Sequence, residues 1–160
     1  KNKDKILCAK FRKGHFEGVL NVMDRLTNMI KPKKIFMGEK DFQQYFLVKK
    51  FIENRYKTKI ISCNTIRTKN YIALSSRNLL LNKKNLLIAS KIIKEIIKLK
   101  KEIKKNDKID KYLLNKKKVL IKKYKIKIEY LELRNIQNLK TSNSFKNSRI
   151  FIAYYLSNVR

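Results

Sequence analysis

The chain has very few of the residues that build metal centres and disulfide frameworks. Among 160 residues there are two cysteines and a single histidine, His15. One histidine nearly excludes a histidine-based metal cage. Cys8 and Cys63 share no metal-binding spacing and no second pair accompanies them, so we expect two buried, reduced thiols rather than a disulfide or a zinc site. No metal-ligating residue is therefore predicted.

Long apolar runs are also missing. No run approaches the roughly 18 residues that a membrane-spanning helix needs, and no signal peptide opens the sequence. The sequence therefore predicts a cytoplasmic protein without a membrane partner. The hydrophobic content of 43% is ordinary for a globular protein, and the length allows one or two modest cores.

Acidic residues are scarce, with 12 Asp and Glu against 42 Lys and Arg and a formal net charge of +30. Such an excess is often the footprint of a nucleic-acid-binding protein. Here the charge is mostly lysine, is spread along the chain and accompanies an excess of Ile and Asn, whereas base reading favours arginine. We therefore favour compositional drift and expect no specific nucleic-acid partner, with a nucleic-acid-binding protein kept as an alternative. The lysine runs at 100–101, 104–105 and 116–118 are predicted to be solvated helix faces.

The only proline, Pro32, follows a set of apolar residues at helical spacing. We predict a helix that ends near Met29 and carries Phe16, Val19, Leu20, Met23, Leu26 and Ile30. After the proline, residues 35–37 form a short apolar run that predicts a buried strand, ended by Gly38.

A strand–helix–strand unit is predicted from here. Asp41 precedes apolar residues that suit an amphipathic helix, and residues 59–63 form a second apolar run. This order implies a right-handed βαβ unit with parallel strands. In parallel sheets ligands collect beyond the carboxyl ends of the strands, where Gly38 is expected.

The second half of the chain has a different pattern. Helices are predicted over residues 86–103 and 109–124, followed by strands over residues 126–133 and 149–156. This half is predicted to be a small α+β lid or accessory domain. The fold class is therefore α/β: a parallel βαβ unit, then a small α+β domain.

The segment after the first strand has residues suited to a phosphate ligand. Gly38 allows close approach of a ligand to the backbone, and Lys40 offers an ammonium group that would offset phosphate charge. Asp41 and Gln44 have the spacing of a helix capping box, which would explain both without a ligand. A capping box explains Lys40 poorly, because a cation opposes the helix dipole at an N-terminus.

A second polar segment follows the second strand. Ser75, Ser76 and Arg77 can donate several hydrogen bonds to phosphate oxygens, and Arg77 can do so bidentately. An ordinary turn with a serine cap would explain the same residues. Because this segment lies close in sequence to the strand end, we expect it to return to the crevice beside Gly38.

Three segments, residues 12–19, 38–44 and 73–78, resemble the pantoate–beta-alanine ligase family, also called pantothenate synthetases, in order and spacing. The strings GEKDFQQ and ALSSRN are specific when they occur together. The resemblance covers most of the chain and weakens after about Lys104.

The resemblance implies a Rossmann-like nucleotidyltransferase fold and a two-step reaction with ATP and Mg²⁺. Pantoate would form pantoyl adenylate, and beta-alanine would then displace AMP. Residues 1–66 would be the second half of the ATP- and pantoate-binding domain, and residues 67–160 the lid, beginning with a KMSKS-like loop. The family is commonly dimeric. The implied ATP-binding residues are Gly38, Glu39, Lys40, Asp41, Ile66, Leu74, Ser75, Ser76 and Arg77; the catalytic residues among them are Lys40, Ser75, Ser76 and Arg77, and Gln44 would bind pantoate.

Some features depart from the family pattern. The upstream MGxLHxGH segment and its pantoate-binding glutamine are not present, and His15 is expected only to order the loop before the first helix. Lys13 replaces a usual proline, and Asn70-Tyr71 stands where the family usually has Asp-Gly. We therefore expect this chain to be the C-terminal part of a longer or split enzyme that does not make pantothenate alone; a non-catalytic remnant is the alternative.

Overall fold

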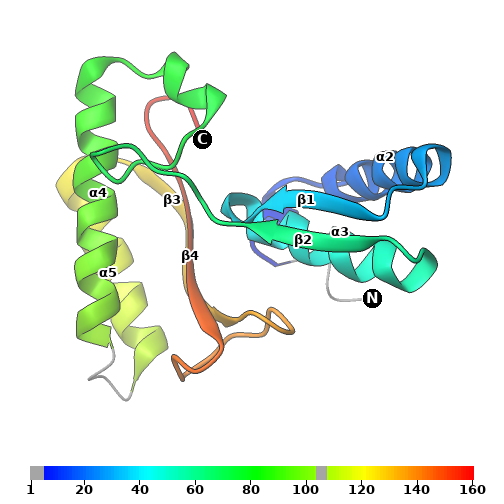
Figure 1. Cartoon of the computed structure of the whole chain (residues 1–160). Helices are drawn as coiled ribbons and strands as arrows, with labels where there is room; N and C mark the ends of the chain where they lie inside the picture. Colours follow the sequence, from blue (N-terminus) through cyan, green and yellow to red (C-terminus); the bar gives the residue numbers. More distant parts are fainter. Residues whose placement is uncertain (1–5, 104–107) are drawn as a thin grey trace. The chain divides into compact units, whose positions relative to one another are not determined.

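The computed structural model describes residues 6–103 and 108–160 and divides the chain into two compact units, Lys1–Ile66 and Arg67–Arg160 (Figure 1). The first unit contains α1 (Cys8–Phe11), α2 (His15–Ile30), β1 (Lys34–Gly38), α3 (Phe42–Arg55) and β2 (Lys59–Cys63). The second contains α4 (Lys83–Glu102), α5 (Ile109–Tyr124), β3 (Lys127–Asn135) and β4 (Ser148–Tyr155). The lysine run at residues 104–105, which was predicted to be a solvated helix face, lies outside the described residues.

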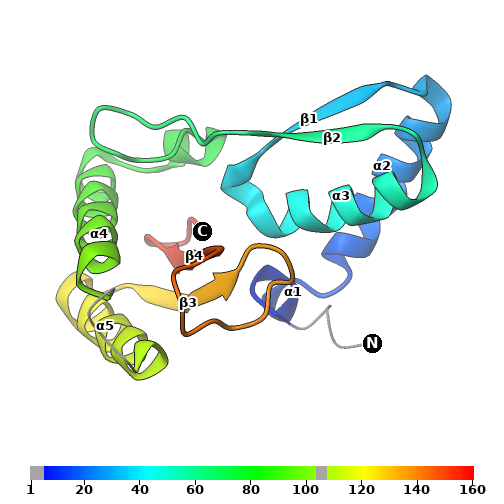
Figure 2. The same ribbon diagram turned by 60° about the horizontal axis from the view of Figure 1, so that its bottom comes forward.

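The first unit is the predicted βαβ unit. β1 and β2 pair in parallel, with Ile35 opposite Ile60 and Gly38 opposite Cys63, so the parallel arrangement is confirmed. Figure 2 shows the two strands side by side with α3 running along them. The predicted first helix is also confirmed, and its last residue is Ile30, where Lys31 adopts the left-handed conformation just before Pro32.

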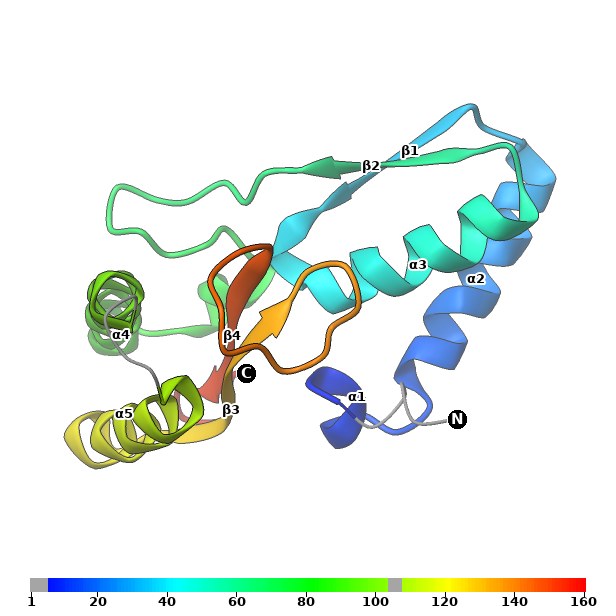
Figure 3. The same ribbon diagram turned by 90° about the horizontal axis from the view of Figure 1, so that it is seen from below.

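One face of this small sheet carries the core. Val48 and Ile52 of α3 and Ile60 of β2 are 0%, 0% and 1% exposed. Both α2 and α3 lie on this face (Figure 3). Around the three buried residues pack the partly buried side chains of Val19, Leu20, Met23, Ile35, Met37, Tyr45, Phe51 and Tyr56.

No described helix of this unit covers the other face of the sheet. Phe36 and Ile61 are directly opposite each other in the parallel register and are 66% and 37% exposed. The prediction of a buried strand at residues 35–37 is therefore wrong for Phe36, which is exposed, whereas Ile35 and Met37 on the core face are partly buried. Successive side chains of a strand point to opposite faces, and both helices of the unit cover the same one, whereas parallel sheets are usually covered on both faces.

α3 also satisfies backbone groups of β2. The carboxylate of Glu53 accepts a hydrogen bond from the Ile60 N–H at 2.9 Å, and the Lys49 ammonium donates to the Ile60 carbonyl at 3.4 Å. Lys49 and Glu53 form an ion pair at 3.4 Å. The hydrogen bond from Ile60, with smaller help from Lys49, holds the pKa of Glu53 below its ordinary value. These bonds occupy backbone groups that another strand would otherwise use, which protects this edge of the sheet.

The second unit packs α4 and α5 against an antiparallel strand pair. α5 has the predicted bounds, residues 109–124. β3 and β4 pair antiparallel from Lys127 opposite Tyr155 to Asn135 opposite Ser148. In Figures 1 and 3 both helices lie on one side of the strands. The buried core consists of Ala89, Ile92, Leu99, Ile103, Ile109, Leu113, Leu120, Ile126, Ile128, Leu131, Leu133 and Leu156.

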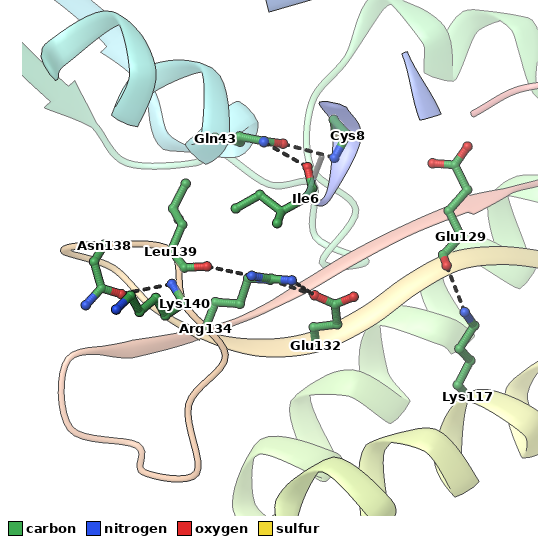
Figure 4. A network of polar contacts seen from close by, with 10 residues as sticks. All are labelled: Ile6, Cys8, Gln43, Lys117, Glu129, Glu132, Arg134, Asn138, Leu139 and Lys140. Carbon is green, nitrogen blue, oxygen red and sulfur yellow. Dashed lines mark hydrogen bonds and ion pairs between the residues drawn. The ribbon is translucent and has the colours of Figure 1, made fainter. Parts of the chain in front are cut away.

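Lysines of α5 are less solvated than predicted. Lys116 forms an ion pair with Glu102 at 3.2 Å, and its ammonium lies 5.4 Å from the centre of the Tyr112 ring. Lys117 donates to the backbone carbonyl of Glu129 at 2.8 Å (Figure 4). The interpretation of residues 116–118 as a solvated face therefore holds for Lys118 only, which is exposed.

A buried arginine orders the segment between β3 and β4. The Arg134 side chain donates to Glu132 at 2.6 Å and to the Leu139 carbonyl at 2.6 Å (Figure 4). Arg134 is only 8% exposed. A charge that is removed from water is tolerated when it is paired and hydrogen-bonded, as it is here.

The thiols differ from the prediction in burial. Cys8 and Cys63 are not joined in a disulfide, but Cys8 is only partly buried and Cys63 is exposed, whereas both were predicted to be buried. Cys63 is the last residue of β2, a strand in which every residue except Ile60 is exposed. Across residues 6–103 and 108–160, the helices lack the length and apolarity needed to cross a membrane.

Two adjacent isoleucines of β2 test the one-sided core. Ile60→Ala should lower the free energy of unfolding by about 3 kcal/mol, because it leaves a cavity among fully buried side chains. Ile61→Ala should cost less than about 1 kcal/mol, because its side chain is already in contact with water. Urea unfolding of the two variants measures the difference; equal losses would show that the second face is covered.

Glu53 should make stability depend on pH. Its pKa is lowered in the folded state, so its stabilisation is present above the unfolded value and is lost as pH falls through the folded value. The free energy of unfolding should therefore decrease as the pH falls below the ordinary carboxylate value of 4.5, and Glu53→Gln should flatten part of this decrease.

Glu17→Gln is the matched control, because Glu17 is an exposed carboxylate of the same unit. Urea unfolding at several pH values is the measurement. If both variants flatten the pH dependence equally, general charge rather than the bond to Ile60 is responsible.

Candidate functional site

The segment Gly38–Gln44 lies at the carboxyl end of β1. Gly38 is the last residue of the strand, and Glu39–Asp41 form a single 3₁₀ turn before α3 begins. Because Gly38 is opposite Cys63, the residues after β2, which include Ile66, leave the same edge of the sheet. The predicted position of Gly38 at a strand end is therefore confirmed.

The candidate side chains of this segment differ in their exposure to solvent. Lys40 and Asp41 are exposed, and Glu39 and Gln44 are partly buried. A Cβ atom at Gly38 would meet nothing within 4 Å, and the residue has an ordinary φ of −70°. Among the described residues, neither packing nor backbone conformation requires a glycine at this position.

The capping box, which the spacing of Asp41 and Gln44 left open as an alternative explanation, is not formed. Asp41 is the N-cap residue of α3, but its side chain makes no capping hydrogen bond. The 3₁₀ turn that precedes the helix gives Asp41 φ −99° and ψ 58°, which is not the extended conformation of a usual N-cap. Asp41 and Gln44 are thus not explained as a mutual cap.

The neighbouring glutamine, Gln43, has the internal role that sequence analysis missed. Its amide is hydrogen-bonded to the backbone of Ile6 and Cys8, at 2.9 Å in both cases (Figure 4). The sequence signal was weak, because Gln43 and Gln44 are identical side chains in adjacent positions. Only the rotation of α3 shows which of the two faces inward.

The serine segment lies in the second unit and forms a capped turn. Ser75 accepts a hydrogen bond from the Arg77 N–H at 3.3 Å and is the N-cap of the 3₁₀ turn Ser76–Leu80. The Asn78 amide donates to the Ala73 carbonyl at 3.0 Å. Leu74, Ser76 and Arg77 are exposed. The serine-capped turn is therefore present, and it leaves the Ser76 and Arg77 side chains open to solvent.

A tight hairpin turn precedes this segment. Arg67 and Ala73 form an antiparallel bridge, and the Tyr71 N–H donates to the Thr68 carbonyl at 2.9 Å. Tyr71 has φ +66°, a left-handed conformation that favours glycine. The buried hydroxyl of Ser90 in α4 donates to the Asn70 carbonyl at 3.0 Å, which fixes the turn.

The candidate residues therefore form two groups, one in each unit. Gly38, Glu39, Lys40, Asp41, Gln44 and Ile66 belong to the first unit, and Leu74, Ser75, Ser76 and Arg77 to the second. Convergence of Lys40 and Arg77 on one triphosphate stays a prediction.

The hollow between α4 and the end of α5 contains none of these candidates. It has a volume of about 760 Å³ and is lined by lysines with a single carboxylate, Glu95. A hydrogen bond from Lys123 lowers the pKa of Glu95. Open hollows lined by lysine are expected on so basic a surface. We therefore base the candidate site on the chemistry of the candidate residues and not on this hollow. Within the described ranges no group of three His, Cys, Asp or Glu side chains could hold a metal ion.

Comparison with known families identifies the chain. The sequence profile of the family described as pantoate-beta-alanine ligase matches residues 1–160. The chain belongs to this family. A curated pantothenate synthetase from Flavobacterium psychrophilum is 32% identical over 158 residues, which is 95% of this chain and 55% of that protein. One from Leptospira interrogans is 47% identical over 75 residues, or 46% of this chain and 26% of that protein.

Solved pantoate-beta-alanine ligases have the same fold. The crystal structure of the Francisella tularensis enzyme, complexed with beta-gamma ATP and beta-alanine, is 32% identical with a TM-score of 0.76, covering 99% of this chain and 53% of that one. Pantothenate synthetase from Thermus thermophilus is similar in fold, with a TM-score of 0.81 at 19% identity, over 98% of this chain and 58% of that one. The chain thus spans little more than half the length of these relatives.

The left-handed tyrosine gives a prediction for the hairpin turn. Tyr71→Gly should raise the free energy of unfolding of the second unit by about 0.5–1 kcal/mol, because the strain at positive φ exceeds the entropy cost of glycine. Tyr71→Ala should give no gain, because alanine keeps the Cβ atom that causes the strain. Thermal unfolding measures both, and equal stabilities of the two variants would contradict the strain.

Proposed function

We propose that this chain carries the ATP-binding part of a pantothenate synthetase. The reaction is the ATP-dependent condensation of pantoate with beta-alanine through pantoyl adenylate, which gives pantothenate, AMP and pyrophosphate. The observation that carries the proposal is the family match over residues 1–160, together with GEKDFQQ at the carboxyl end of β1. Support for the substrates comes from the Francisella tularensis relative, which is complexed with beta-gamma ATP and beta-alanine.

The reaction is limited by negative charge. The pantoate carboxylate has to approach the α-phosphorus of a polyanionic nucleotide, so cationic groups have to neutralise the phosphates as the transition state forms. Lys40 is exposed at the mouth of the sheet, where its ammonium group can reach toward a phosphate. Gly38 allows the nucleotide to lie against the backbone, with Glu39 and Asp41 beside it, and Ile66 offers backbone groups to the adenine.

The second unit is proposed to supply a mobile phosphate-binding loop. Leu74, Ser75, Ser76 and Arg77 take the place of the KMSKS loop, closing over the phosphates and releasing pyrophosphate. The exposed guanidinium of Arg77 can bind phosphate oxygens bidentately, and the Ser76 hydroxyl can donate one further hydrogen bond. Ser75 has to exchange its bond with the Arg77 N–H for one with the ligand.

Gln44 is proposed to hydrogen-bond pantoate. It is partly buried in the first turn of α3, and the capping role that would have explained it is not observed. An amide can both donate to the pantoate carboxylate and accept from a hydroxyl group. This places the carboxylate substrate beside the ammonium group of Lys40, which is four residues earlier in the chain.

Magnesium is proposed to enter with the nucleotide. Mg²⁺ is usually held by substrate phosphates with one or two carboxylates rather than by a cage made wholly of protein groups. The described residues fit this mode, since they present Glu39 and Asp41 beside Lys40 but no three-residue acidic cluster. When bound, the ion would neutralise phosphate charge. A cytoplasmic location and a homodimer, both expected for the family, belong to the same proposal.

ATP binding tests the two proposed cations. Lys40→Ala and Arg77→Ala should each weaken binding of ATP with Mg²⁺ by about tenfold or more, since each removes a charge-assisted hydrogen bond. Isothermal titration calorimetry is the measurement. The effect should be larger at low salt, because screening weakens the attraction of exposed charges.

Lys50→Ala and Arg25→Ala are the matched controls, since both remove an exposed positive charge of the same type. They should leave the affinity for ATP within about twofold of the unchanged chain. If all four variants weaken binding alike, ATP is held by the general charge of the chain and the proposed site is wrong.

A further inference from the structure

Gln43 is a buried amide in the first turn of α3, and both ends of its side chain are used. It is 4% exposed. Its Oε1 atom accepts from the Cys8 N–H at 2.9 Å, and its Nε2 atom donates to the Ile6 carbonyl at 2.9 Å. Figure 4 shows the amide directed at the backbone of both residues. The side chain therefore pairs with this segment as a neighbouring strand would.

A neutral amide is the side chain that this arrangement requires. It supplies one acceptor for an N–H group and one donor for a carbonyl group. An ionised carboxylate could only accept, and an apolar side chain could do neither. Loss of the amide would leave the backbone groups of Ile6 and Cys8 without these partners, which is costly where water is excluded.

The segment that Gln43 holds leads into residues 12–19, the first of the three segments that resemble the family. Cys8 is the first residue of the single turn α1 (Cys8–Phe11), which is followed by Arg12. Gly14 then turns the chain with φ +74° into α2. Fixing Cys8 against α3 therefore fixes the point from which Arg12–His15 start.

Gln43 also sets the direction of its neighbour. Adjacent residues of an α-helix point about 100° apart around the axis. When the Gln43 amide is anchored inward, the rotation of the first turn of α3 is fixed, and Gln44 is held about 100° around the helix axis from the anchor. The 3₁₀ turn with Lys40 joins the same helix end.

We propose that Gln43 is a positioning residue of the ligase site. Its amide locks the segment 6–8 to the helix end that carries Lys40 and Gln44, and so orients Gln44 toward pantoate. This inference rests on the proposed function, because it assigns a role within that site. The side chain itself does not contact a substrate.

The rate at which the Cys8 thiol reacts measures how firmly the Gln43 amide holds residues 6–8 against α3. The chain has only two cysteines, so Cys63→Ser leaves Cys8 as the single thiol. In this background Gln43→Leu, which has a similar volume, should speed the reaction of Cys8 with dithiodipyridine about tenfold, because two hydrogen bonds no longer hold the segment closed. Gln44→Leu should leave the Cys8 rate unchanged.

Gln43→Glu is a second variant, in which the two hydrogen bonds to residues 6–8 should depend on pH. Ionised, the new carboxylate faces the Ile6 carbonyl and repels it; protonated, it regains a donor and an acceptor. The ratio of its Cys8 rate to that of the unchanged side chain should be well above one at about pH 8 and fall toward one at about pH 5. A ratio that does not change with pH would show that a general loss of structure is responsible.

Ligand affinity separates a positioning role from a purely structural one. By calorimetry, Gln43→Leu should weaken pantoate binding in the presence of ATP and Mg²⁺ at least about fivefold, with thermal unfolding confirming that the variant is folded. An unchanged Cys8 rate would overturn the proposal. So would faster Cys8 labelling with unaltered pantoate affinity.

The proposed function and the positioning role of Gln43 can be disproved separately. If the unchanged chain binds neither ATP nor pantoate, the proposed function is wrong for this chain and the positioning role falls with it. The Cys8 rates would in that case still show whether Gln43 holds the segment closed. If ligands bind and only Gln44→Leu weakens pantoate binding, the function stands and the role of Gln43 is rejected.

Discussion

The contact of α3 with β2 is the constraint on which the first unit depends. A parallel strand pair needs a connection that crosses from one end of the sheet to the other, and α3 supplies it. Burial of Val48, Ile52 and Ile60 fixes this crossover on one face. As a result the strands end together, with Gly38 opposite Cys63, and Lys40 is placed by an apolar contact in which it takes no part.

Periodicity predicted the elements well, because helical and strand repeats reflect the side that is buried. It gave the bounds of α5 and the parallel order of β1 and β2. It could not show that Phe36 is exposed, since a short strand reveals alternation but not whether anything covers each face. The GEKDFQQ and ALSSRN strings identified the family, but spacing could not exclude a capping box at Asp41, because the intervening 3₁₀ turn leaves no mark in the sequence.

Partners from other elements explain most of what sequence analysis missed. Gln43 bonds to residues more than thirty positions away, and Lys116 pairs with Glu102 on another helix. In a chain with 42 basic and 12 acidic residues, most lysines have to face water. The few that are satisfied depend on where a carboxylate or carbonyl happens to lie in space, which single-sequence patterns do not contain.

The side of the β1–β2 sheet opposite α2 and α3 has a consequence for how the chain behaves in concentrated solution. Phe36 and Ile61 form an apolar patch that two molecules could share, while the net charge of +30 keeps molecules apart. Added salt shortens the range of this repulsion to about 10 Å at 0.1 M without weakening apolar attraction. The lysine excess therefore acts as a colloidal stabiliser, and self-association should rise with ionic strength unless another polypeptide occupies the patch.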